Sequence, residues 1–179
     1  MYQVILDTVV MGEFLAQFFD RQAASRGAGR FVPAGWITND LARRLNRILD
    51  LQCSGFLDED SPHSGSGVVI SSFAFVELVR KWDDIVEGRF GMLEFRVFLD
   101  QPPEWVIIDP LDEFLTQAFA EVPSRVLDHN GNWLSIEWAD AVHAATTISR
   151  GRNAMLATSD KKMTLIPELK GRVIELSRS

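Results

Sequence analysis

Four carboxylate side chains are notable because each one occurs in an apolar stretch of the sequence. Asp7 directly follows a short apolar run, Asp160 follows another after Thr158 and Ser159, and Glu77 and Asp140 interrupt segments rich in Phe, Val, Leu and Ala. Carboxylates are seldom found in such company without a cation or strong donors nearby. Two unit charges about 4 Å apart at an effective dielectric of about 20 repel by roughly 4 kcal/mol. If folding gathers these four acids, they must hold protons or bind a hard cation.

The donor types narrow the choice of cation. Four carboxylates supply only oxygen ligands, and the lone Cys53 excludes a cysteine-based zinc site. Mg²⁺ or Mn²⁺ is therefore the expected cofactor, because both ions prefer oxygen ligands. A carboxylate-held divalent ion suits phosphoryl chemistry, since it can activate water and neutralise charge that grows on a phosphodiester. We expect the four acids to act both as metal ligands and as catalytic residues.

The elements that must position these acids alternate between strand and helix along the chain. The patterns predict strands over 4–6, 68–70, 105–108, 154–158 and 173–176, and helices over 9–20, 40–52, 73–85, 90–99, 110–120 and 135–150. Ser135 is the expected N-cap of the last of these helices. Such alternation predicts a three-layer α/β/α fold with a central, mainly parallel sheet. Ligands bind at the carboxyl ends of parallel strands, which is where Asp7 and Asp160 stand.

Composition and charge set the broad class of the protein. A chain of 179 residues with 46% hydrophobic residues predicts a single domain over 1–179. The net charge of −7 repels phosphate, so nucleic-acid binding would need local basic patches or bound metal. No apolar run has the length of a membrane span, and the N-terminus lacks the pattern of a secretion signal. We expect a cytoplasmic protein that does not enter the membrane.

Four segments together resemble the PIN domain, a family of metal-dependent ribonucleases that includes the toxins of VapBC-type toxin-antitoxin pairs. The segments are VILDT, ISSFAFVELVR, WADAVHAAT and LATSD, and they leave mainly an insertion at about 21–67 unmatched. Carried over position by position, Asp7, Glu77, Asp140 and Asp160 match the acidic quartet of the family. The resemblance implies a PIN-like fold, an Mg²⁺ or Mn²⁺ site and cleavage of RNA. It also implies a small antitoxin that places a basic side chain or a helix across the acidic groove, and we expect a homodimer.

One departure from the family pattern supports a different class of function. Val9 stands where the family usually has Asn or another small polar residue after the Asp-Thr pair. The alternative is a catalytically degenerate PIN-like domain that serves as an RNA-binding or protein-binding module. A receiver-like or phosphatase-like domain is disfavoured, because no lysine or further motif stands where those chemistries need one.

Several neighbouring residues have both a structural and a functional interpretation. Glu77 can pair with Arg80 or Lys81 across a helix turn instead of binding metal. His143 lies one turn from Asp140, and a core histidine bonded within the fold is favoured over a catalytic base. The Thr8 hydroxyl can orient a bound water or cap a turn.

The predicted insertion leaves three interpretations open. Its helix over 40–52 carries arginines on one side, which can contact phosphates or form an ordinary solvated face. This helix can cover the groove, bind a partner or form a dimer contact. The polar stretch over 58–67 is either a metal loop or, as its Ser, Pro and Gly content favours, a flexible tip.

Overall fold

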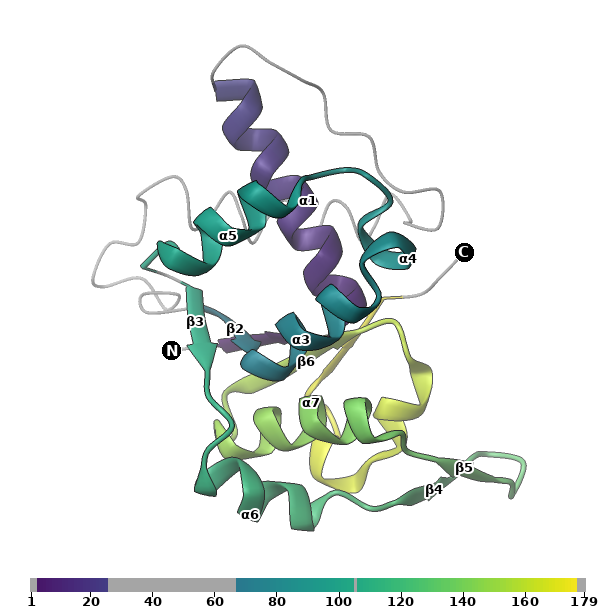
Figure 1. Ribbon diagram of the computed structural model, residues 1–179. Coiled ribbons are helices and arrows are strands. Elements are labelled where there is room, and N and C mark those ends of the chain that lie inside the picture. Colours follow the sequence, from purple (N-terminus) through teal and green to yellow (C-terminus); the bar gives the residue numbers. More distant parts are fainter. Residues whose placement is uncertain (1–2, 26–66, 105, 177–179) are drawn as a thin grey trace.

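The structure is a computed structural model that describes residues 3–25, 67–104 and 106–176. The described part of the chain forms three layers, with a parallel sheet between two groups of helices (Figure 1). The sheet contains β1 (Gln3–Leu6), β2 (Gly67–Ser71), β3 (Val106–Asp109), β6 (Ala154–Thr158) and β7 (Val173–Glu175). The other described elements are α1 (Thr8–Ser25), α3 (Ser72–Arg80), α4 (Trp82–Val86), α5 (Met92–Asp100), α6 (Glu113–Glu121), α7 (Trp138–Ser149), η1 (Lys161–Leu165), η2 (Pro167–Leu169) and the hairpin β4 (Arg125–Leu127) and β5 (Trp133–Ser135). The predicted helix over 40–52 and nearly all of the 58–67 loop lie outside the described residues.

The order of the strands explains how residues from both ends of the chain meet. The strands lie in the order β3-β2-β1-β6-β7, and every neighbouring pair is parallel. β1 is central and pairs with β6, with Leu6 opposite Ala157. The residues that follow these two strands therefore emerge side by side at the carboxyl edge of the sheet. The predicted three-layer fold with a parallel sheet is confirmed.

Alternation along the strands divides the apolar core between the two faces of the sheet. Leu6 and Ile70 pack on the side of α1, α3, α4 and α5, whereas Ile5 and Val69 pack on the side of α7 and the 3₁₀ turns η1 and η2. Successive side chains of a strand point to opposite faces, so a strand covered on both sides must be apolar throughout. All five residues of β2 are buried. This burial fixes the register of the strands and hence the positions at which they end.

Close packing of α1 against α4 depends on a glycine. A Cβ atom on Gly12 would lie 2.3 Å from Cγ2 of Ile85, which is closer than van der Waals contact permits. The buried Glu13 carboxylate follows on α1 and is paired with Arg89 in the segment after α4. Burial raises the pKa of Glu13, and the Arg89 charge opposes that effect. These contacts hold α4 against α1 and so support α3, which carries Glu77.

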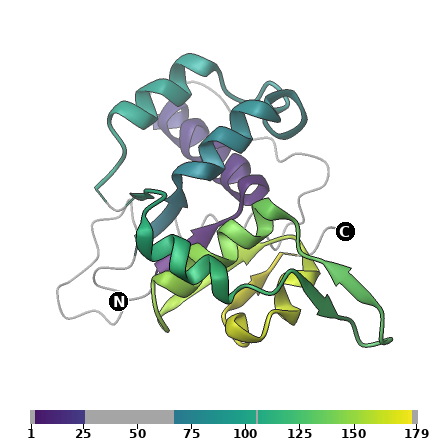
Figure 2. The same ribbon diagram turned by 60° about the horizontal axis from the view of Figure 1, so that its bottom comes forward.

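The start of α7 differs from the sequence-based prediction. Ser135 is not a helix cap but the last residue of β5, which pairs antiparallel with β4 and gives a hairpin that was not predicted. The hairpin extends away from the sheet in both ribbon views (Figure 2). Glu137 is the N-cap residue of α7, without a side-chain capping bond. Trp138, the first residue of α7, is 58% exposed.

The remaining predicted elements match the structure to within a few residues. The predicted helix over 73–85 is interrupted at Lys81, which separates α3 from α4. Ser71 caps α3, and its Oγ accepts a hydrogen bond from Phe73 N at 3.2 Å. Within the described parts of the chain, no helix combines the length and apolar character that a membrane crossing requires.

Candidate active site

The Asp7 carboxylate lies at the carboxyl end of β1 and is held by backbone donors. Its Oδ1 accepts from Val10 N at 2.7 Å, and its Oδ2 accepts from Ser159 N at 3.3 Å. Val10 N belongs to the first turn of α1, where a carboxylate complements the helix dipole. Val9 does not disturb this arrangement, because the donor is the backbone of the next residue. Burial raises the pKa of Asp7, although the His143 charge and hydrogen bonds from its neighbours oppose the rise.

Glu77 lies on α3 and is linked across the sheet edge to Asp7's neighbour, Thr8. The Thr8 hydroxyl donates to Glu77 Oε2, while Lys81 Nζ lies 2.6 Å from Glu77 Oε1. The predicted pairing of Glu77 with a cation one turn along its helix is therefore confirmed for Lys81. Interaction with His143, then with Lys81 and Thr8, lowers the pKa of Glu77 to about 2 against the opposing effect of burial. Glu77 is thus held as a carboxylate.

His143 contacts Thr8 and Glu77 from α7. It is buried on α7, its Nε2 lies 3.2 Å from Thr8 Oγ1, and the same nitrogen lies 3.8 Å from Glu77 Oε2. The prediction of a core histidine bonded within the fold agrees with this placement. Its Nδ1 is buried without a hydrogen-bond partner among the described residues. We call Asp7, Thr8, Glu77 and His143 the buried group.

Asp140 and Asp160 form a second set of contacts around a lysine. Lys162 Nζ lies 2.8 Å from Asp140 Oδ2 and 3.1 Å from Asp160 Oδ2. Burial lowers the pKa of Lys162, but the bonds to the two carboxylates outweigh it and raise the pKa above its ordinary value of 10.5. The Asp140 and Asp160 side chains are 23% and 38% exposed. We call Asp140, Asp160 and Lys162 the ion-pair group.

The two groups adjoin each other through α7 and the end of β6. Asp140 and His143 are three residues apart on α7, so they lie on neighbouring parts of one helix face. Thr158 and Ser159 lead from β6 into Asp160, and Ser159 N donates to Asp7. All four predicted site acids therefore lie at the carboxyl edge of the sheet, divided between two sets of hydrogen-bond partners.

The donor chemistry at this edge fits a hard divalent ion. The Lys162 ammonium already marks a position where one cation is bound by two carboxylate oxygens. Carboxylate oxygen is the ligand that Mg²⁺ and Mn²⁺ prefer. Among the residues that the structure describes, no three His, Cys, Asp or Glu side chains are arranged closely enough to hold an ion. The fit therefore rests on Asp140 and Asp160, while Asp7 and Glu77 are bound by other donors in this arrangement.

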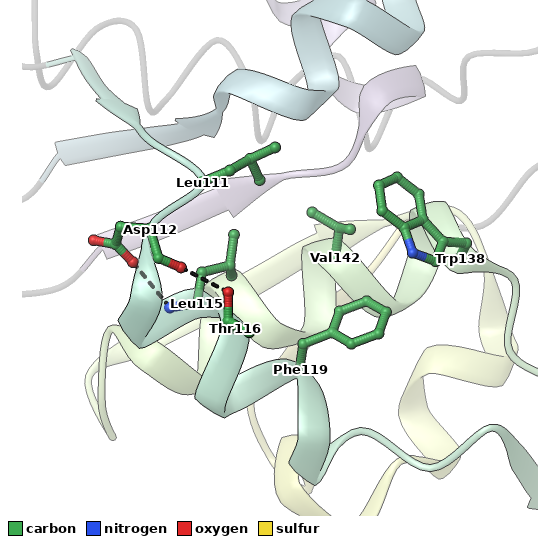
Figure 3. A pocket seen from close by; sticks show the side chains of 7 residues that line it. All are labelled: Leu111, Asp112, Leu115, Thr116, Phe119, Trp138 and Val142. Atoms are coloured by element: carbon green, nitrogen blue, oxygen red, sulfur yellow. Dashed lines mark hydrogen bonds between the residues drawn. The ribbon is translucent and has the colours of Figure 1, made fainter.

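An apolar cleft lies beside the site, between α6 and the start of α7 (Figure 3). Its volume is about 230 Å³, and its lining is formed by Leu111, Asp112, Leu115, Thr116, Phe119, Trp138 and Val142. Asp112 accepts from Leu115 N, and Thr116 donates to the carbonyl of Asp112, so these polar groups are engaged within α6. The Phe73 ring separates the cleft from the buried group, with centroids 4.7 Å from Trp138 and 6.3 Å from His143. The cleft can accept an apolar group but offers little to bind an ion.

The sequence pattern located the acids but missed the residue that connects two of them. Lys162 follows Asp160 by two residues, in a segment where no further strand or helix was predicted. Its backbone N donates to Asp160 Oδ1 at 3.0 Å, because Asp160 caps the 3₁₀ turn η1. The sequence signal for this contact was a lysine two residues after an aspartate at the end of a predicted strand. The reach of its side chain to Asp140 depends on the tertiary structure.

The comparisons with known proteins support the fold. The sequence matches no protein-family model and no curated protein. The structure is similar to a chain in the crystal structure of VapBC2 from Rickettsia felis bound to a DNA fragment from their promoter. The TM-score is 0.54, the sequences are 17% identical, and the likeness covers 97% of this chain and 98% of that chain. The chain thus has a three-layer α/β/α fold of the PIN-like type.

Proposed function

We propose that the protein is a divalent-metal-dependent endoribonuclease that acts as the toxin of a toxin-antitoxin pair. The observation that supports the proposal is the position of Asp7, Glu77, Asp140 and Asp160, which lie at the carboxyl edge of the parallel sheet in two adjoining groups. Two of these carboxylates, Asp140 and Asp160, already bind one cation in the form of Lys162. The likeness to a VapBC2 chain supports the same conclusion from the fold.

In this proposal Asp140 and Asp160 hold Mg²⁺ or Mn²⁺, with Asp7 and Glu77 as further ligands. When bound, such an ion supplies Lewis acidity and neutralises the charge that grows on a phosphodiester. The protein residues contribute position and charge. Val10 N and Ser159 N fix the Asp7 carboxylate, and Thr8 and Lys81 fix Glu77. The lowered pKa keeps Glu77 ionised, and Lys81 offsets part of its charge.

The test is cleavage of RNA by the purified protein with Mg²⁺ or Mn²⁺, compared with Asp7→Asn and Asp140→Asn. We expect metal-dependent cleavage by the parent and a loss of about a hundredfold or more in each variant. Asp83→Asn is a matched control, because Asp83 is an exposed acid on α4 outside the site. Full activity of Asp140→Asn, or no cleavage by a folded parent protein with either ion, contradicts the nuclease.

A degenerate binding module is the second candidate function, and a specific observation favours it. Three of the site acids have a lysine partner, since Lys81 binds Glu77 and Lys162 binds both Asp140 and Asp160. A site in which two lysines offset part of the carboxylate charge can persist without metal. RNA binding without cleavage, measured by fluorescence anisotropy in EDTA and in Mn²⁺, would identify the module.

The proposed partners are an antitoxin and a second copy of the chain. An antitoxin with a basic side chain would complement the acidic edge, and its addition should inhibit RNA cleavage.

For the homodimer, the supporting observation is the exposure of large apolar side chains beside the cleft, namely Leu111 (56%), Phe114 (64%) and Trp138 (58%). Light scattering after size exclusion should give twice the chain mass, and Phe114→Glu should give a monomer. A cytoplasmic location stays a prediction.

A further inference from the structure

Lys162 occupies the space between two carboxylates that are proposed to bind metal. Its ammonium lies within 3.1 Å of Oδ2 of both Asp140 and Asp160, and its side chain is only 19% exposed. The backbone of Lys162 is fixed as well, because its N–H donates to the other oxygen of Asp160. The ammonium is therefore held at this position by contacts from α7 and from the end of β6.

The same carboxylate oxygens cannot bind an ammonium and a divalent ion in the same place. Both cations require Oδ2 of Asp140 and Oδ2 of Asp160, and two positive charges at that separation repel each other. We propose that Lys162 is a tethered cation that competes with divalent ions for Asp140 and Asp160. Its ammonium must leave both carboxylates before an ion can bind there. This inference rests on the proposed metal-dependent function and adds the residue that controls ion binding.

The lysine side chain has the properties that such a competitor needs. Its ammonium is a compact charge on a flexible four-carbon stem, so it can release the carboxylates without any movement of the backbone. In its bound position it offsets the repulsion between Asp140 and Asp160, so the metal-free protein retains its structure at this edge. Arginine at this position would keep the charge, whereas glutamine would keep much of the length without it.

The experiment is calorimetric titration of Mn²⁺ into the whole metal-free protein and its variants. We expect Lys162→Gln to bind Mn²⁺ about tenfold more tightly than the parent, because the competing charge is gone. Lys161→Gln is the matched control. It removes the same charge from the adjacent residue, but Lys161 is 75% exposed and faces Glu175 at 3.8 Å. Its Mn²⁺ affinity should equal that of the parent within about twofold.

Two further variants make the result independent of a single substitution. Lys162→Arg should bind Mn²⁺ as weakly as the parent. Lys162→Met should also bind Mn²⁺ about tenfold more tightly than the parent, and it replaces Lys162→Gln if the glutamine variant does not fold. Circular dichroism in EDTA identifies folded variants. Equal Mn²⁺ affinity of the Lys162→Gln and Lys161→Gln proteins, weaker binding by the former, or no Mn²⁺ binding by any variant overturns the inference.

Cleavage of RNA, measured separately, distinguishes the inference from the proposed function. Tighter Mn²⁺ binding by Lys162→Gln without RNA cleavage by any variant supports the competing lysine and contradicts the nuclease. Metal-dependent cleavage by the parent together with unchanged Mn²⁺ affinity in Lys162→Gln has the opposite meaning. In that case the nuclease is supported and the competing lysine is excluded.

Discussion

The two halves of the candidate site hold their acids by different means. In the buried group, Asp7 and Glu77 are bound by backbone N–H groups, a hydroxyl and an imidazole, largely shielded from water, and the exposed Lys81 pairs with Glu77 from outside the group. In the ion-pair group, Asp140 and Asp160 share one lysine ammonium and remain partly exposed. Removing the partner of a buried polar group lowers the free energy of unfolding substantially, whereas a partly exposed ion pair contributes little to it. The buried group is therefore the rigid half of the site, and the ion-pair group is the half that can exchange its cation.

The largest expected effect comes from removing the imidazole of the buried group. His143→Ala should lower the free energy of unfolding by about 2–3 kcal/mol, because it leaves a cavity and removes a partner of Thr8 and Glu77. Lys162→Ala should cost about 1 kcal/mol or less. Urea unfolding in EDTA measures both. Equal losses in the two variants would show that the halves do not differ in this way.

Acid titration of Glu77 should sharpen the contrast. Its pKa is lowered from 4.5 to about 2 in the folded protein, so its contribution to stability is present above pH 4.5 and is lost as the pH falls toward 2. Relative to Glu77→Gln in EDTA, the parent should lose about 1–2 kcal/mol over this range after allowance for solvent screening. Unfolding curves at pH 5 and pH 3 provide the measurement. Equal losses of stability in the parent and in Glu77→Gln would contradict the low pKa.

Asp7 should respond to pH in the opposite sense. Its folded pKa is raised above 3.8, chiefly by burial, so stability is full below that value and declines as the pH rises through the folded pKa. Asp7→Asn should then be more stable than the parent at pH 8 in EDTA, by on the order of 1 kcal/mol, and the gain should shrink at pH 4. Asp140→Asn serves as the comparison, because it loses its bond to Lys162 and should gain nothing at pH 8.

Salt should produce the smallest effect, and it should weaken the contacts of Lys162 more than those of His143. At about 1 M salt the Debye length falls to roughly 3 Å, so the partly exposed contacts of Lys162 are weakened. The stability difference between the parent and Lys162→Gln should shrink by a few tenths of a kcal/mol between low and high salt. The difference for His143→Ala should stay constant. Unfolding of all three proteins at both salt concentrations checks this, and equal salt responses would contradict it.

Much of the fold was predictable because its signals are local. The apolar runs at the start of the chain and at 154–158 indicated buried parallel strands, and the structure has β1 and β6 there. The β4–β5 hairpin was missed, since its strands have three residues each and carry no extended alternation. Ser135 was predicted as a helix cap because the type of residue alone does not distinguish a cap from the end of a strand.

The sequence by itself determined which residues are chemically unusual, since a carboxylate in an apolar segment is visible without any structure. It also determined that Asp7 and Asp160 end strands. The pairing of Glu77 with Lys81 was also visible as a helical spacing, but only the tertiary structure decided the long-range partners of these acids, because the contacts of Thr8 with Glu77 and of Lys162 with Asp140 join residues far apart in the chain. Such contacts depend on strand order and side-chain reach, which no local pattern encodes. That is the physical reason why the lysine between the two aspartates was not anticipated.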